Sequence, residues 1–181
     1  MKNKFSKTLK TGKLCEVYFE PDNTGKFAVY RLLYVGKDCY VAAAYDRYGN
    51  YDGVECGYID QTIKVATDTL YLKCLERLIQ DKNPFDISLV KPTESGLLKN
   101  VLDYVIEKRV MCEIEVCGSG GDCVTGYVKL RDEESVTVEC FDLYGRGDGE
   151  SVICFDDITN VAFDTLDAKK CEKLSWYQNE E

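Results

Sequence analysis

Two aspartate pairs in a repeated loop are the first residues of this sequence whose type and spacing could do chemistry. The pattern D-x-Y-G-x-x-D-G begins at Asp46 and occurs again 96 residues later. The pairs are Asp46 with Asp52 and Asp142 with Asp148. They could bind calcium through oxygen ligands, but the spacing lacks the alternating acids and the final Glu of an EF-hand. We therefore expect no metal and no cofactor, and interpret the first Asp of each pair as a side chain that binds turn amides.

Three further groups resemble reactive motifs only in composition. Gly118–Gly121 has the glycine content of a phosphate cradle, but no Gly-Lys-Ser/Thr ending and no helix follow it. Cys112 and Cys117 have opposite strand parity, so they do not form a zinc site. The acidic runs Asp132–Glu134 and Asp156–Asp157 have no identifiable nucleophile beside them, and we interpret them as solvated turns. The chain also has no histidine, which excludes imidazole acid–base chemistry and favours a protein that is not an enzyme.

The repeated loop belongs to a longer internal duplication. Residues 45–78 match residues 141–174 at 14 of 34 positions without a gap. The length of 181 residues fits two small units of about 75 residues each. We predict a first domain at residues 1–79, a linker at residues 80–94 and a second domain at residues 95–181.

Each copy has the pattern of five short strands with helices at its ends. Val136, Val138 and Cys140 alternate with polar residues, as in a strand with one buried face. In copy one we predict strands at 14–19, 27–35, 39–45, 54–59 and 63–66, and a helix at 68–79. In copy two we predict strands at 110–117, 123–130, 135–141, 151–155 and 158–163, and helices at 97–107 and 164–174. The lysine-rich residues 1–13 predict a frayed or short solvated helix.

This arrangement resembles an Sm-like barrel, a member of the SH3-like small barrels. The pattern G-x-V-x-L-x-D at residues 126–132, followed by an alternating strand, is similar to the family's first motif. Residues 59–65 and 155–161 lie where such barrels often place a one-turn 3₁₀ helix. The resemblance implies a mainly β protein with flanking helices, built as two tandem five-stranded SH3-like or Sm-like barrels. The RNA-binding members usually carry polar and basic residues where copy two has Glu133 and Asp156, so their uridine site is not carried over.

Charge and cysteine content indicate the surroundings of the protein. The net charge is −9, and it divides into +2 for residues 1–91 and −11 for residues 92–181. Copy two should therefore repel nucleic acid, whereas copy one need not. The ten cysteines occur singly within apolar patterns, which indicates buried thiols in a reducing cytoplasm. No apolar run approaches the length of a membrane span, and we expect no membrane association and no signal peptide.

Tyrosine is concentrated in copy one, which holds nine of the thirteen. Tyrosine offers a large amphipathic contact area, although the same residues could instead line a barrel core and cover its ends. Our candidate residues for binding a ligand or partner are Tyr45, Arg47, Tyr48, Tyr51 and Arg31. We predict a non-catalytic cytoplasmic binding or adaptor module that recognises a protein segment or small ligand through copy one. The alternative is an RNA- or nucleotide-binding Sm-like protein that uses the same tyrosines; the oligomeric state stays open.

Overall fold

The computed structural model describes residues 1–20, 25–119 and 122–178. Residues 120–121 of the glycine-rich loop therefore lie outside the described residues. The chain divides into two compact units, residues 1–97 (unit 1) and residues 98–181 (unit 2), and each is described by itself. No helix in the described segments is long and apolar enough to cross a membrane.

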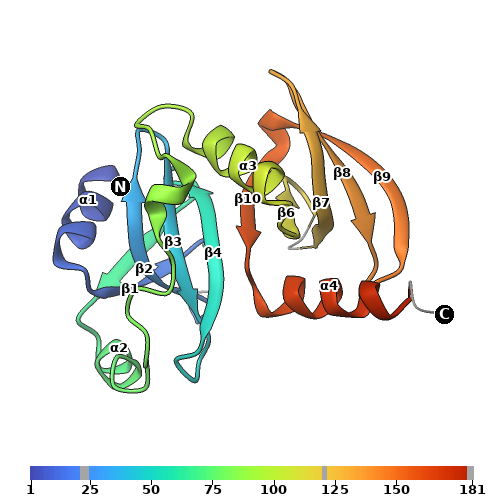
Figure 1. The fold of residues 1–181 in the computed structure, drawn as a ribbon. Helices are drawn as coiled ribbons and strands as arrows, with labels where there is room; N and C mark the ends of the chain where they lie inside the picture. The colour runs from blue at the N-terminus through green and yellow to red at the C-terminus, as the bar shows by residue number, and fades with distance from the viewer. Residues whose placement is uncertain (21–24, 120–121, 179–181) are drawn as a thin grey trace. The chain divides into compact units, whose positions relative to one another are not determined.

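Unit 1 contains a five-stranded antiparallel sheet and two α-helices (Figure 1). Its elements are α1 (Lys2–Thr11), β1 (Leu14–Tyr18), β2 (Ala28–Val35), β3 (Cys39–Tyr45), β4 (Tyr51–Tyr58), β5 (Lys64–Thr67), α2 (Leu70–Leu75) and the 3₁₀ turn η1 (Ile87–Val90). The strand order is β5-β1-β2-β3-β4. The register shifts within β2–β3 and β3–β4 are irregularities of the kind that bend a sheet.

Unit 2 repeats this plan. Its elements are α3 (Leu97–Lys108, which starts at the unit boundary), β6 (Cys112–Val116), β7 (Cys123–Arg131), β8 (Ser135–Phe141), β9 (Gly147–Cys154), the 3₁₀ turn η2 (Phe155–Asp157), β10 (Ile158–Phe163) and α4 (Leu166–Gln178). The strand order β10-β6-β7-β8-β9 is that of unit 1. The shifts in register recur within β7–β8 and β8–β9.

The predicted mainly β fold with flanking helices is confirmed, but neither sheet is closed into a barrel. In the described residues β5 pairs with β1 and β4 pairs with β3, while β5 and β4 are not neighbours. The strand that would close the unit 1 sheet has only four residues, so it offers little edge for a second partner. β10 and β9 likewise stand at the two ends of the order in unit 2.

The N-terminal helix differs from the prediction of a frayed or solvated segment. Phe5 is fully buried, and its ring stacks on Tyr40 with centroids 4.7 Å apart. The helix ends at Gly12, whose left-handed φ of 63° lets its N–H bond to the Leu9 carbonyl. Phe5, the buried Thr8 and the partly buried Leu9 dock α1 on the unit 1 core.

Each unit contains an equivalent hydrogen bond that connects its first strand to the start of its last α-helix. Glu16 of β1 is buried and accepts a hydrogen bond from the Thr69 hydroxyl at 2.5 Å. Thr69 in turn caps α2 by accepting from the Leu72 amide. In unit 2 the Thr165 hydroxyl donates to Glu113 at 2.5 Å. The same threonine–glutamate pair thus ties helix to sheet in both copies.

Candidate functional site

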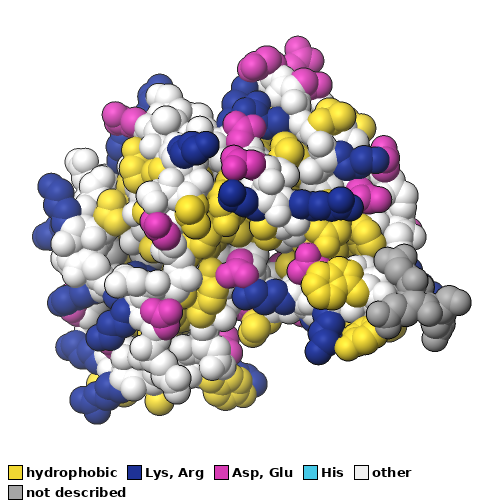
Figure 2. Space-filling view, in the orientation of Figure 1, with side chains coloured by type: hydrophobic (Ala, Val, Ile, Leu, Met, Phe, Trp, Pro, Cys, Tyr) yellow, Lys and Arg dark blue, Asp and Glu magenta, His cyan; other side chains and the backbone are white. Residues whose placement is uncertain are grey.

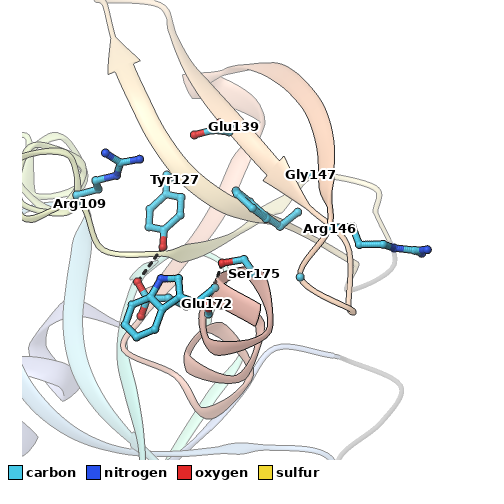
Figure 3. Close-up of a pocket in the computed structure, with 10 residues that line it drawn as sticks. Arg109, Tyr127, Glu139, Arg146, Gly147, Glu172 and Ser175 are labelled. Carbon is cyan, nitrogen blue, oxygen red and sulfur yellow. Dashed lines mark hydrogen bonds between the residues drawn. The ribbon is translucent and has the colours of Figure 1, made fainter. Parts of the chain in front are cut away.

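A pocket of about 640 Å³ opens in unit 2 between the sheet, the second copy of the repeated loop and α4. Figure 3 shows the side chains that line it. The sheet contributes Tyr127 on β7 and Glu139 and Phe141 on β8, and α4 contributes Glu172, Ser175 and Trp176. A pocket of this volume lies within the range of small-molecule sites.

The register of β7 and β8 builds the sheet side of the pocket. Tyr127 and Glu139 are direct cross-strand partners, so their side chains share one face. Phe141 lies two residues beyond Glu139 on the same face. Its ring meets the Tyr127 ring edge to face, with centroids 5.7 Å apart. A Cβ at Gly126 would collide with the Glu139 carbonyl, so this glycine permits the close approach of the two strands.

Helix α4 supplies the opposite side, and within the pocket Tyr127 joins it to the sheet. The Tyr127 hydroxyl donates to Glu172 Oε1 at 2.8 Å, and the Ser175 hydroxyl donates to the Glu172 carbonyl at 2.7 Å (Figure 3). Burial, together with the hydrogen bond to Glu172, raises the pKa of the Tyr127 phenol well above its ordinary value. Tyr127 therefore stays protonated at neutral pH and acts as a fixed donor.

The charges around the pocket differ in their availability. Arg146 is held in an ion pair with Asp142 at 2.6 Å, and its guanidinium points away from the other labelled side chains in Figure 3. Arg109 lies over the Tyr127 ring, with Cζ 5.6 Å from the centroid. Among the described residues, neither Glu139 nor Glu172 forms a salt bridge. The pocket is therefore lined by two carboxylates and two guanidinium groups, of which that of Arg146 is already paired with Asp142.

The repeated loop fixes the position of α4 beneath the pocket. Asp142 accepts hydrogen bonds from the amides of Tyr144 and Arg146, both at 2.9 Å. Gly145 has a left-handed φ of 75°, and a Cβ there would lie 2.7 Å from the Leu174 side chain. The loop can rest on α4 only because residue 145 has no side chain.

The first copy of the loop has the same construction. Asp46 accepts from the amides of Tyr48 and Asn50, both at 2.8 Å. These hydrogen bonds outweigh the effect of burial and lower the pKa of Asp46. Gly49 has φ 83°, and a Cβ there would lie 2.9 Å from Leu78. The structure thus uses the first Asp of each repeated loop as a turn ligand, as we interpreted it.

In unit 1 the position equivalent to the pocket is occupied by the chain itself. The strand registers and the repeat offset place Arg31 at the position of Tyr127, Tyr45 at Phe141, Tyr51 at Gly147, Glu76 at Glu172 and Ile79 at Ser175. Arg31 donates to Glu76 at 2.9 Å, just as Tyr127 donates to Glu172. Tyr51 packs edge to face against Tyr45 at 6.4 Å, in one cluster with the buried Ile79.

This arrangement divides the five predicted binding residues. Arg31 and Tyr45 are buried, at 7% and 6% exposure, and Tyr51 is half-buried beside them. Burial lowers the pKa of Arg31, but hydrogen bonds to Glu76 and Tyr45 raise it overall, so its charge is permanently engaged. Arg47 and Tyr48 are exposed, and the Arg47 guanidinium lies 4.8 Å from the Tyr48 ring centroid. The structure therefore leaves only Arg47 and Tyr48 of the five on the surface.

The other candidate motifs lie at separate places. Of the three neighbouring cysteines in unit 2, Cys112 is buried, whereas Cys117 and Cys123 are exposed. In the described part of the chain, no group of three or more Cys, Asp or Glu side chains could hold a metal ion. Asp132 accepts from the amides of Glu134 and Ser135 at the tip of the β7–β8 hairpin. Figure 2 shows acidic side chains gathered there on the surface of unit 2.

Sequence reasoning missed the pocket residues of unit 2, although one signal was present. Tyr51 of unit 1 is replaced by Gly147 at the equivalent position of unit 2. The same difference shows that unit 2 lacks the ring that fills unit 1, and Ser175 in place of Ile79 enlarges the gap. Trp176, the one tryptophan of the chain, is 63% exposed beside this gap.

Comparisons with known proteins give no match for this chain. No protein-family model, no curated protein and no solved structure matches it. The functional reasoning therefore depends on the site itself.

Proposed function

We propose that this protein is a non-catalytic binding module whose ligand site is the pocket of unit 2. One observation carries the proposal: Gly147 and Ser175 leave open in unit 2 the place that Tyr51 and Ile79 fill in unit 1. Two units with the same strand order and the same loop would otherwise be expected to have equally filled interiors. An opening built by small residues in only one copy indicates selection for a ligand rather than for packing.

The state of the polar groups supports binding rather than catalysis. Tyr127 remains a protonated donor, and the hydroxyl of Ser175 is turned to a helix carbonyl. The hydrogen bond to Glu172 contributes to raising the pKa of Tyr127, whereas an activated nucleophile needs a lowered pKa, so Tyr127 is a hydrogen-bond donor. Aromatic rings with a few fixed polar groups are typical of recognition sites.

We further propose that the two units are diverged copies of one SH3-like or Sm-like small barrel, related by internal duplication. The shared strand order, the repeated loop and the threonine–glutamate link support this. We propose a cytoplasmic location because the ten cysteines occur singly within apolar patterns, and thiols persist in a reducing compartment.

The single tryptophan provides the test. Protein labelled with 5-fluorotryptophan gives one fluorine NMR signal, from Trp176 at the edge of the pocket. We expect a library of small aromatic and polar fragments to contain compounds that shift this signal saturably. In the double variant Gly147→Tyr, Ser175→Ile, which copies unit 1, the shifts should disappear.

Leu143→Tyr is the matched control, because Leu143 is 78% exposed on the same loop and does not line the pocket. It should respond to the fragments as the unmodified protein does. If no fragment shifts the signal, or if the double variant responds equally well, the pocket is not a binding site.

A second candidate function has its own observation. The exposed pair Arg47 and Tyr48 could stack a nucleobase or contact a partner chain, as predicted for copy one. A salt titration of single-stranded RNA binding tests it: affinity should fall with rising salt and with Arg47→Ala. No binding at low salt would remove this candidate.

A further inference from the structure

We propose that the unit 2 pocket takes an aryl group that carries a positive charge, such as an aromatic ring joined to an ammonium group. This inference rests on the proposed function, since it names the ligand chemistry of the same pocket. It is carried by what unit 1 places at the equivalent position and by the charges that unit 2 changes there.

The aromatic part follows from Tyr51. In unit 1 its phenol ring occupies the space beside Tyr45, with an interplanar angle of 68°. In unit 2 the counterpart of Tyr45 is Phe141, and the counterpart of Tyr51 is Gly147, where an added Cβ would have nothing within 4 Å. A space shaped for a ring in one copy and left empty in the other favours a ring supplied from outside.

The rest of the pocket offers further aromatic contact. Tyr127 stands at right angles to Phe141, with an interplanar angle of 87°, and Trp176 lines the same opening. A ligand ring beside Phe141 can therefore reach a second and a third aromatic side chain.

The positive charge follows from the polar substitutions. Ala43 of unit 1 is replaced by Glu139, which faces Tyr127 across the strands. Glu172 is kept, but the guanidinium that neutralises its counterpart Glu76 in unit 1 is absent, because Tyr127 replaces Arg31. Unit 2 thus gains one carboxylate and loses one internal cation at the site.

Unit 2 also adds two arginines, which equal this change in number, so the preference depends on where the cations are held. Arg109 stands where unit 1 has Gly12, and its guanidinium remains over the Tyr127 ring. Arg146 stands where unit 1 has Asn50, but Asp142 holds its charge. Lys129, near Glu139, is paired with Glu150 at 2.6 Å. Unit 2 as a whole, residues 98–181, carries 9 Lys and Arg against 19 Asp and Glu. A field of this sign concentrates cations at the pocket and repels anions.

Three compounds that share one ring separate the parts of the proposal. They are tyramine, which is cationic, p-cresol, which is neutral, and 4-hydroxyphenylacetate, which is anionic. Titrated against the fluorotryptophan signal of the whole protein, tyramine should bind about tenfold more tightly than p-cresol, as expected for one charge-assisted contact. 4-Hydroxyphenylacetate should bind more weakly than p-cresol.

Glu139→Gln tests the carboxylate. It should reduce the affinity for tyramine to that for p-cresol and leave p-cresol binding unchanged, and unchanged thermal unfolding will show that the variant is folded. Rising salt should weaken tyramine alone. If Glu139→Gln weakens p-cresol binding as much as it weakens tyramine binding, the residue shapes the pocket rather than selecting charge, and the proposal is overturned.

Two further arms identify the source of the group and the level at which the idea fails. If the group is a chain N-terminus, the peptide Tyr-Gly-Gly, with its free amino group, should bind more tightly than its acetylated form. If the group is a free amine, acetylating the peptide should lower its affinity no more than acetylation lowers the affinity of tyramine. If 4-hydroxyphenylacetate binds as tightly as tyramine, and Gly147→Tyr removes both, the pocket is a ligand site of different charge preference. If fragments bind but none of the aryl compounds does, the ligand chemistry is wrong and the binding site stands.

Discussion

Units 1 and 2 use the same backbone plan to hold two different interiors. Both have the strand order that places the fifth strand beside the first, and both hold the loop aspartate and glycine against a helix. In unit 1 the space beside the loop contains Tyr51 and a buried Arg31–Glu76 ion pair. In unit 2 the same space is a pocket. The comparison teaches that the residues common to the two copies maintain the fold, whereas the residues that differ decide whether a cavity exists.

Substituting the loop glycines should have the largest effect. Gly145→Ala forces a side chain onto the backbone of α4 at a left-handed φ, and we expect it to destabilise unit 2 by about 3 kcal/mol. Gly149 also has a positive φ, of 80°, but open space around it. Gly149→Ala should therefore cost about 1 kcal/mol. Urea unfolding of both variants measures the difference; equal losses would mean that contact with α4 does not hold the loop.

Tyr51→Gly should create in unit 1 a cavity like the unit 2 pocket, which is the reverse of filling that pocket with Gly147→Tyr. Tyr51→Gly removes a half-buried ring from the Tyr45 cluster, and we expect a loss of about 2–3 kcal/mol in the free energy of unfolding. The cavity should then bind p-cresol and raise the melting temperature of the variant, but not that of the unmodified unit 1. Thermal unfolding with and without p-cresol measures this rescue. A variant that collapses without binding p-cresol would show that the two units differ in more than residue 51.

The two equivalent polar pairs should differ in strength. Arg31→Met leaves the partly exposed carboxylate of Glu76 with the longer ion pair to Lys82 at 3.6 Å, and we expect a loss of about 1–2 kcal/mol. Tyr127→Phe removes one neutral hydroxyl donor from Glu172 and should cost about 1 kcal/mol. Denaturant unfolding of the two variants compares them. If Tyr127→Phe lowers the free energy of unfolding more than Arg31→Met does, the Tyr127–Glu172 pair is the stronger of the two and the prediction is wrong.

Acid should affect both units through the same residue type, with the smallest effect. The pKa of Asp46 and the pKa of Asp142 are lowered in the folded protein. Each carboxylate therefore stabilises the fold at a pH above its unfolded pKa of about 3.9, and this contribution is lost as the pH falls through the folded value. Unfolding midpoints measured from pH 6 to pH 2 should decline less in Asp46→Asn and Asp142→Asn. If the unfolding midpoints of the variants decline with pH as steeply as that of the unmodified protein, the loop hydrogen bonds do not cause the acid sensitivity.

Much of the fold could be predicted from residue patterns. The strands at 39–45 and 135–141 and the helix that begins at residue 97 were found because apolar alternation and helical spacing are local properties. The burial of Phe5 was not found, because it depends on contact with Tyr40 rather than on the helix itself. Barrel closure was also not predictable, since hydrogen bonding between the ends of a sheet depends on strand length and bending together.

The candidate site was harder to predict for a related reason. Arg31 and Tyr45 were chosen because exposed Tyr and Arg residues are common in interfaces, but their strand register turns them toward α2 and the core. The pocket depends on the absence of side chains at Gly147 and Ser175, and a gap is visible only when the surrounding residues are placed. Residue types indicate which side chains could contact a ligand, but they do not show where the fold leaves a cavity.

The clasp between the repeated loop and α4 has a consequence for protein engineering. Asp142 shapes the loop through hydrogen bonds to its amides, and Gly145 rests against Leu174 of the helix; neither interaction involves residue 147 or residue 139. Residues 139 and 147 can therefore be exchanged while the loop and its contact with α4 stay intact. Unit 1, with its filled interior, would serve as a reference within the same molecule, reporting whether a redesigned unit 2 has changed its specificity or merely its stability.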